Sequence, residues 1–237
     1  MYDDFLESEY NNAGELFGLD AISRMMQSTN PIKKALGLKK LIQHNSVNTS
    51  RKSRAEFEKV FKNLPDHVRS GLQKGEIRLT DYIIYSIKPI NSKTIKMFEP
   101  QDDKEVGVRN ISNAKLPKNM VFLVSGIYLL TGTNTAPANP EGHKAIRFGS
   151  VSNVPTISNG EFSLKANRKQ IIPENQAIRG FVSDNDHTIP LGYYKLDNPR
   201  LIRDEEIIEF TIELGTQLDI PANQWMYVGL DGTGTTP

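Results

Sequence analysis

Four histidines and one acidic turn are the residues of this chain best suited to metal binding. The histidines are His44, His67, His143 and His187, and no two of them are spaced as a ligand pair. Residues 184–187 read Asp-Asn-Asp-His and bring oxygen ligands together as a calcium loop does. The glycine and the distal glutamate of an EF-hand are missing, which favours a polar turn. We therefore expect no metal site and no cofactor.

Two short motifs could carry a phosphate or a nucleophile. Residues 229–234, Gly-Leu-Asp-Gly-Thr-Gly, lack the Lys-Ser/Thr of a phosphate loop and the Asp-Thr/Ser-Gly order of an aspartic protease. Ser125 lies inside an apolar stretch, without the Gly-x-Ser-x-Gly pattern of a serine hydrolase. The chain also has no cysteine, which excludes thiolate chemistry and disulfides. The sequence therefore predicts no catalytic residue, and we expect a protein that is not an enzyme.

Charge is strongly segregated near the N-terminus, although the formal net charge of the whole chain is only +1. Residues 1–30 carry −5, and residues 31–78 carry +8. Lys and Arg neutralise phosphates in nucleic acids, and basic amphipathic helices bind anionic membranes. Alternatively, the basic segment is a solvated surface, or it pairs with the acidic segment of the same or another copy. The candidate interaction residues in it are Lys33, Lys34, Lys39, Lys40, Arg51, Lys52 and Arg54.

The elements that would position these residues are helices. Apolar residues recur at helical spacing over 14–28, and a shorter helix is predicted over 32–43. Residues 53–56, Ser-Arg-Ala-Glu, form a capping box at the start of a third helix, which Pro65 ends. A further helix follows Pro65, with Val68 and Leu72 facing inward. We expect residues 1–75 to form a helical N-terminal arm.

From Glu76 the hydrophobic period changes from 3.6 to 2, which predicts strands. A first strand up to Lys88 is followed by short strand candidates separated by turn-rich segments. These candidates are 93–98, 106–112, 120–131, 145–149, 161–165, 176–182, 191–195, 206–214 and 225–231. The spacing is typical of an antiparallel β-sandwich or jelly roll over 76–231, with a tail over 232–237. The expected fold class is therefore mainly β with an α-helical N-terminal segment.

The most hydrophobic stretch of the chain runs from Met120 to Leu130. It is too short for a membrane helix, which needs about 20 apolar residues. Apolar residues occupy both faces of the predicted strand, so we expect both faces to be covered. One face would fill the β core. The other, with Val121 and Leu123, would contact the N-terminal helices or a neighbouring subunit.

Residues 110–127 and 192–202 resemble the strands and loops of phage virion proteins, and the layout of the chain is similar to jelly-roll capsid proteins of icosahedral bacteriophages. About 160 residues hold one jelly roll rather than two. The resemblance implies a structural virion protein that is synthesised in the host cytoplasm and assembles through its β domain and N-terminal arm. Its partners would be copies of itself and other virion proteins, and the basic segment 31–78 would contact the genome or an internal membrane. No small-molecule substrate is expected.

Two alternative functions remain open. In the first, the protein is a portal, tail connector or ring component of a phage. In the second, it is a carbohydrate-binding β-sandwich module, which would need exposed aromatic residues on a sheet. The candidates for that role are Tyr193, Tyr194 and Trp225.

Overall fold

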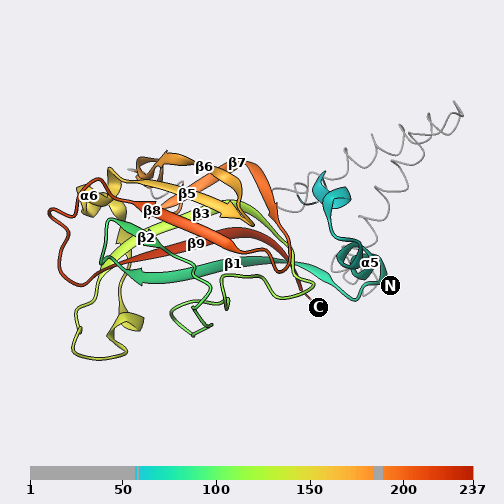
Figure 1. The fold of residues 1–237 in the computed structure, drawn as a ribbon, viewed down its shortest axis with the longest axis horizontal. Helices are drawn as coiled ribbons and strands as arrows, with labels where there is room; N and C mark the ends of the chain where they lie inside the picture. Colours follow the sequence, from blue (N-terminus) through green and yellow to red (C-terminus); the bar gives the residue numbers. More distant parts are fainter. Residues whose placement is uncertain (1–56, 58, 184–188, 237) are drawn as a thin grey trace, which may run out of the picture. The chain divides into compact units, whose positions relative to one another are not determined.

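The computed structural model describes residue 57 and the ranges 59–183 and 189–236, which form two compact units (Figure 1). Of the described residues, the first unit contains those up to Asp81, together with Asn119–Leu123 and Thr233–Thr236. The second unit contains Tyr82–Lys118 and Val124–Gly232. The helices predicted over 14–28 and 32–43, and the capping box at 53–56, lie outside the described residues.

The first unit contains the short helix η1 (Phe61–Asn63) and the helix α5 (Asp66–Lys74). Pro65 is the N-cap of α5, and Val68 and Leu72 are buried, which confirms the helix predicted after Pro65. The helix ends at Gly75, whose φ of 74° favours glycine. A Cβ at Gly71 would lie 2.5 Å from the Ile77 side chain, so a glycine there allows the helix and the following strand to pack closely.

The rest of the described chain is mainly β. Its strands are β1 (Arg78–Pro89), β2 (Thr94–Lys96), β3 (Phe122–Thr133), β4 (Gly149–Ser150), β5 (Glu161–Ala166), β6 (Lys169–Ala177), β7 (Tyr193–Ile202), β8 (Ile208–Glu213) and β9 (Gln224–Thr236). Short helices connect some of them, namely η2 (Gly142–Ala145), η3 (Val151–Asn153), α6 (Pro155–Ser158) and η4 (Ile178–Phe181).

These strands form two sheets in a sandwich-like arrangement (Figure 1). One has the order β1-β9-β3-β4, with β7 also paired to β3, and the other has the order β2-β8-β5-β6. The pairs β2–β8, β3–β4, β5–β6 and β5–β8 are antiparallel. Strand β8 alternates buried Ile208, Phe210 and Ile212 with exposed glutamates, as a strand with one wet face should. The expected class, mainly β with antiparallel sheets, is confirmed.

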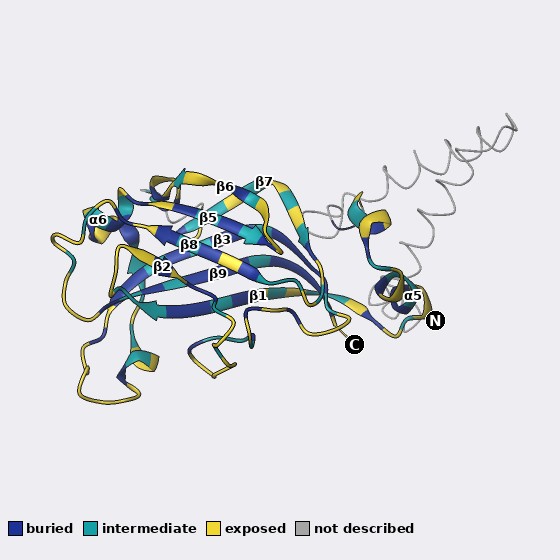
Figure 2. Ribbon diagram, viewed as in Figure 1, coloured by how far each residue is buried: buried dark blue, intermediate teal, exposed yellow. Residues whose placement is uncertain are grey.

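Apolar side chains fill the core of the second unit, where the strands are dark in Figure 2. The ring centroid of Phe162 lies 5.0 Å from that of Phe181 and 5.6 Å from that of Phe210. The five-stranded sheet contributes side chains that are fully buried or nearly so: Ile84, Ile87, Ile127, Leu129, Met226, Val228 and Leu230. Each such side chain stabilises the fold by roughly 1.5–3 kcal/mol.

The segment 106–112, predicted as a strand, is instead a loop that covers the edge of β1. Its Arg109 makes isolated bridges to Ser86 and to Glu105, and the Ile87 N–H donates to the Val108 carbonyl at 2.9 Å. An unpaired edge strand invites association with other chains. The apolar residues of the loop, Val108 and Ile111, are buried because they pack at this edge and not because they continue a ladder.

Two further boundaries differ from the sequence pattern. Over 176–182 the structure has the end of β6 and the short helix η4, and residues 169–175 form the strand. Strand β6 contains Pro173, which edge strands tolerate. Because the strand is mostly exposed, it lacks the alternation of apolar and polar residues that marks a strand in the sequence. Strand β7 continues through Leu196–Pro199, where the sequence predicted a turn, because pairing with β3 overrides local propensity.

The predicted tail over 232–237 also differs, because β9 continues through Thr236. Thr233 and Thr235 are buried, at 3% and 0% exposure. The Thr235 hydroxyl and backbone hydrogen bonds hold this segment in place. The sequence prediction relied on apolar residues to identify strands, so it did not extend the last strand over 232–236.

Candidate interaction surfaces

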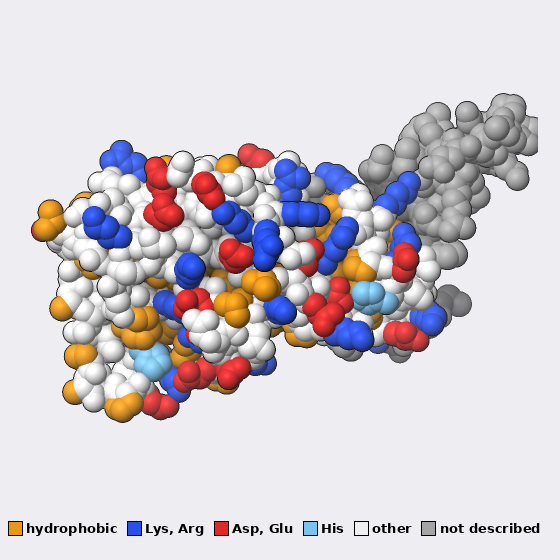
Figure 3. All heavy atoms as spheres, viewed as in Figure 1, with side chains coloured by type: hydrophobic (Ala, Val, Ile, Leu, Met, Phe, Trp, Pro, Cys, Tyr) orange, Lys and Arg blue, Asp and Glu red, His pale blue; other side chains and the backbone are white. Residues whose placement is uncertain are grey.

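The basic residues singled out from the sequence lie outside the described residues, from Lys33 to Arg54. Of the same segment, Lys59, Lys62, Lys74 and Arg78 are described and exposed, and Arg69 forms an ion pair with Asp66. On the face shown in Figure 3, basic and acidic side chains of the described chain are interspersed. The interaction role of the basic segment stays a prediction.

Val121 and Leu123 are fully buried, and both belong to the first unit, as does α5. Val121 is fixed through its backbone to Thr235. Its N–H donates to Thr235 Oγ1 at 2.9 Å, and its carbonyl accepts from the Thr235 N–H at 2.9 Å. The Thr235 hydroxyl in turn donates to the Asn119 carbonyl at 3.1 Å. The two side chains are thus covered within one chain, and their contact with a neighbouring subunit stays a prediction.

The candidate metal ligands are not brought together in the described residues. His67 is exposed, and His143 stacks on Trp225 with ring centroids 5.1 Å apart and planes 8° from parallel. The turn 184–187 and His44 lie outside the described residues. Across the described chain, no three His, Asp or Glu side chains lie close enough to hold a metal ion. Nor does that part contain a helix both long and apolar enough to span a membrane.

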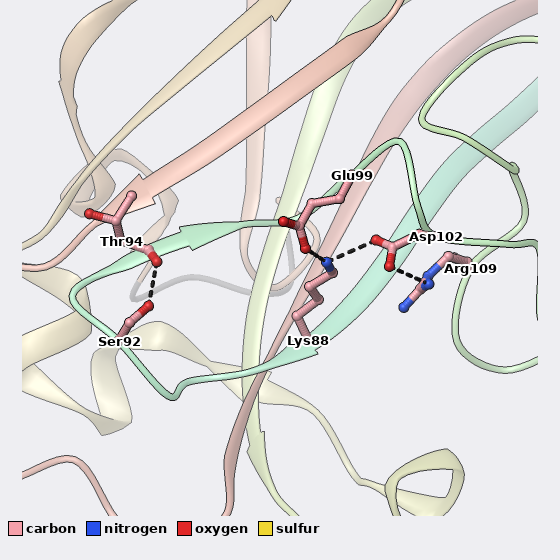
Figure 4. A network of polar contacts seen from close by, with 6 residues as sticks. All are labelled: Lys88, Ser92, Thr94, Glu99, Asp102 and Arg109. Carbon is pink, nitrogen blue, oxygen red and sulfur yellow. Dashed lines mark hydrogen bonds and ion pairs between the residues drawn. The ribbon is translucent and has the colours of Figure 1, made fainter.

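An ion-pair network ties β1 to the loop that follows β2 (Figure 4). Lys88 Nζ pairs with Glu99 and lies 2.8 Å from Asp102 Oδ2, while Arg109 lies 2.9 Å from Asp102 Oδ1. The Lys88, Asp102 and Arg109 side chains are only 13–16% exposed. Two acids balance two bases. The arrangement therefore fixes the loop over the edge of β1 and leaves no unbalanced charge for a ligand.

The outer face of the five-stranded sheet carries one tyrosine on each of four neighbouring strands. We call this set the tyrosine row: Tyr85 on β1, Tyr227 on β9, Tyr128 on β3 and Tyr193 on β7. The Tyr85 and Tyr227 ring centroids are 6.0 Å apart with planes 16° from parallel. Those of Tyr128 and Tyr193 are 4.8 Å apart with planes tilted by 49°. All four residues are half-buried.

Tyr193 lies across β3 because Gly126 has no side chain. A Cβ on Gly126 would lie 2.1 Å from the Tyr193 hydroxyl oxygen. The hydroxyl passes this point and donates to Asp231 Oδ2 on β9 at 3.1 Å. Burial, followed by the charge of Asp231 and this hydrogen bond, raises the pKa of Tyr193 well above its ordinary value. One ring therefore links three strands and is held in a single orientation.

The sequence identified only part of this surface. Of its three aromatic candidates, Tyr193 belongs to the tyrosine row, whereas Tyr194 faces the core, 5.4 Å from Phe181, and Trp225 is stacked by His143. Tyr85, Tyr128 and Tyr227 were missed because strands far apart in the chain bring them together. Glycines inside apolar strands, here Gly126 and Gly229, were the signal that marked a close approach.

No protein-family model matches this chain, and no curated protein matches it either.

Proposed function

We propose that this chain is a structural virion protein of a bacteriophage, a capsid or capsid-associated component that assembles with copies of itself. In this proposal the β domain is a single jelly roll and the N-terminal arm makes contacts between subunits. The observation that carries the proposal is the order in which the strands pair.

The strand order supports a jelly roll. If the two-residue β4 is set aside, the described chain has eight strands. The first pairs with the last (β1–β9), the second with the seventh (β2–β8), the third with the sixth (β3–β7) and the fourth with the fifth (β5–β6). This is one long antiparallel ribbon folded back on itself. The additional pairs β9–β3 and β8–β5 roll that ribbon into two sheets, as in an eight-stranded jelly roll.

Loop contacts at both ends agree with the rolled ribbon. At one end, the Ile90 N–H donates to the Gln224 carbonyl, and Thr156 Oγ1 donates to the Leu218 carbonyl at 2.7 Å. At the other, Lys115 bridges Ile207, whose carbonyl accepts from the Asn167 N–H at 2.9 Å. Alternate connections therefore meet at opposite ends of the sandwich.

Jelly rolls occur in viral capsids, lectins and cupins, so the fold alone does not choose among functions. The core of this sandwich is filled by apolar side chains, among them Phe162, Phe181 and Phe210. The resemblance to phage capsid proteins and the charge-segregated arm of −5 and +8 favour assembly with repeated neighbours.

The test is the assembly state of the purified full-length chain. Light scattering after size exclusion, followed by negative-stain electron microscopy, should show shells or uniform multimers that grow with protein concentration. A ring would indicate the connector alternative. A chain that stays monomeric at high concentration, and is missing from purified particles of a phage that encodes it, would refute the proposal.

A further inference from the structure

The tyrosine row lies on a sheet face that two loops partly cover. The ring centroid of Phe148 lies 5.6 Å from that of Tyr227, and the Gly107 N–H reaches the Tyr85 hydroxyl. Ile83, two residues before Tyr85 on β1, is 39% exposed. It lies beside Gly229 of β9, where an added Cβ would be 3.2 Å from Ile83 Cγ2 and 3.0 Å from the Tyr227 hydroxyl. The alternate residues Ile84, Met226 and Val228 are fully buried, so the tyrosines point away from the core. The face therefore carries a cluster of half-buried aromatic rings next to two glycines.

The row is also rigid before any ligand arrives. The Tyr193 hydroxyl is bound to Asp231, and the Tyr85 hydroxyl accepts a hydrogen bond from the Gly107 N–H at 3.3 Å. Ser125 Oγ donates to the Asp231 carbonyl at 3.3 Å, which ties β3 to β9 beneath the row. Side chains that are already ordered lose little conformational entropy on binding.

The chemistry of the face combines aromatic surface with hydroxyl groups and the carboxylate of Asp231. A sugar ring offers an apolar face of C–H groups, which packs on an aromatic ring, and a rim of hydroxyls, which bond to phenol and carboxylate oxygens. The four strands of the row are about 4.8 Å apart. The residues of an extended sugar chain repeat at a similar distance, so successive sugars could meet successive strands.

We infer that the tyrosine row, with Asp231, binds a neutral oligosaccharide chain laid across strands β1, β9, β3 and β7. This site is separate from the assembly contacts of the proposed function and would give the protein a second role in glycan recognition. The binding residues are Tyr85, Tyr227, Tyr128 and Tyr193 for packing, and Asp231 for hydrogen bonding.

The size of the surface favours a sugar chain over a second copy of the protein. A stable protein interface buries about 800 Å² on each partner. Each tyrosine can bury about 150–250 Å², and all four are already half-buried, so the row offers well under that area. A linear oligosaccharide needs only a narrow strip.

Affinity gel electrophoresis of the full-length chain tests the inference. The probes are five neutral polysaccharides: laminarin, xylan, galactomannan, dextran and hydroxyethyl cellulose. At least one should retard the wild type, and Tyr128→Ala/Tyr227→Ala should weaken that retardation at least tenfold. Tyr128→Phe/Tyr227→Phe keeps the rings and should lose no more than a few-fold. Val106→Ala, at a side chain that is 84% exposed in the loop beside β1, is the matched control and should bind as the wild type does.

Hydrogen exchange with the retarding polysaccharide provides a readout that does not depend on the variants folding. Protection should rise in β1 and β9 and stay unchanged in β6. No retardation by any of the five probes would overturn the inference, and so would protection confined to other strands. If the probes fail while the alanine pair reduces multimer formation, the row is a contact between copies. Because assembly is measured separately, failure here leaves the proposed function standing.

Discussion

At the scale of single residues, the missing side chain at Gly126 allows Tyr193 to cross β3 and reach Asp231. The position is buried, and an added Cβ would lie within 2.4 Å of the Tyr193 hydroxyl oxygen and two carbons of its ring. Real Cβ contacts are never this short, so the ring would have to move. The hydrogen bond to Asp231 would be lost with it.

We predict that Gly126→Ala destabilises the protein by about 1–3 kcal/mol, because overpacking outweighs the smaller entropic gain of replacing glycine. Urea unfolding followed by circular dichroism measures the effect. The control is Gly215→Ala, where no atom lies within 4 Å of the new Cβ and the stability should stay level or rise by up to about 1 kcal/mol. In a Tyr193→Ala background the cost of Gly126→Ala should fall. Equal costs in both backgrounds would show that the ring does not occupy this space.

The raised pKa of Tyr193 predicts a pH dependence of stability. The folded protein holds the phenol proton more tightly than the unfolded chain, whose tyrosines ionise near pH 10. The resulting stability is fully present below about pH 10 and is lost as the pH rises above it. Urea unfolding at about pH 9 and about pH 11 should therefore show a larger loss for the wild type than for Tyr193→Phe. Parallel losses would mean that Tyr193 ionises as freely in the folded protein as in the unfolded chain.

At the scale of elements, the last strand illustrates how polar residues extend a ladder. Thr235 is fully buried. Its hydroxyl accepts a hydrogen bond from the Val121 N–H and donates one to the Asn119 carbonyl, and all three residues belong to the same unit. The end of β9 therefore holds the segment that leads into β3. Apolar packing alone would not supply an acceptor for the buried Val121 N–H.

Thr235→Val keeps the shape of the side chain and removes its hydroxyl. We expect a loss of about 1–3 kcal/mol in the free energy of unfolding, the cost of leaving the buried Val121 N–H without its acceptor. Thr236→Val, at the neighbouring exposed position, is the matched control and should change stability by less than about 0.5 kcal/mol. Hydrogen exchange should show faster exchange at Val121 in the first variant only. Similar exchange in both variants would argue against the role of the hydroxyl.

At the scale of the whole molecule, charge is arranged in segments while the total is close to zero. The +8 of residues 31–78 follows the −5 of residues 1–30, and the described β domain mixes both signs. A protein with this distribution can bind a polyanion through one segment without repelling its own copies. Phosphate contacts of that kind are strongly salt-dependent.

Replacing Lys33, Lys34, Lys39 and Lys40 by Gln should weaken binding of double-stranded DNA, measured by fluorescence anisotropy. The slope of log affinity against log salt should become shallower by up to about 3–4, since each phosphate contact contributes about 0.9. The matched control removes four exposed lysines of the β domain: Lys93, Lys96, Lys104 and Lys118. If both variants lose affinity equally, only total charge matters. If both variants bind DNA as the wild type does, but only the first variant binds anionic vesicles more weakly, the segment contacts lipid.

The sequence alone determined the fold class of this protein, because buried apolar residues recur every 3.6 residues in helices and every two residues in strands. Both spacings are visible within a short stretch of sequence. Alternation in Ile208–Glu213 predicted a strand with one wet face, and Pro65 followed by Val68 and Leu72 predicted the helix α5. It could not find β6, which is an exposed edge strand with almost no alternation, or the end of β9, which the Thr235 hydroxyl and backbone hydrogen bonds hold.

Only the tertiary structure decided which strands are neighbours. Pairing joins the first strand to the last and the third to the sixth, so residues far apart in the chain, such as Tyr85 and Tyr227 or Tyr193 and Asp231, come into contact. A local pattern contains no information about such pairs, because each depends on how the whole ribbon rolls. The sequence could therefore predict a sandwich and name Tyr193 as a candidate, but the tyrosine row exists only once the sheet has formed.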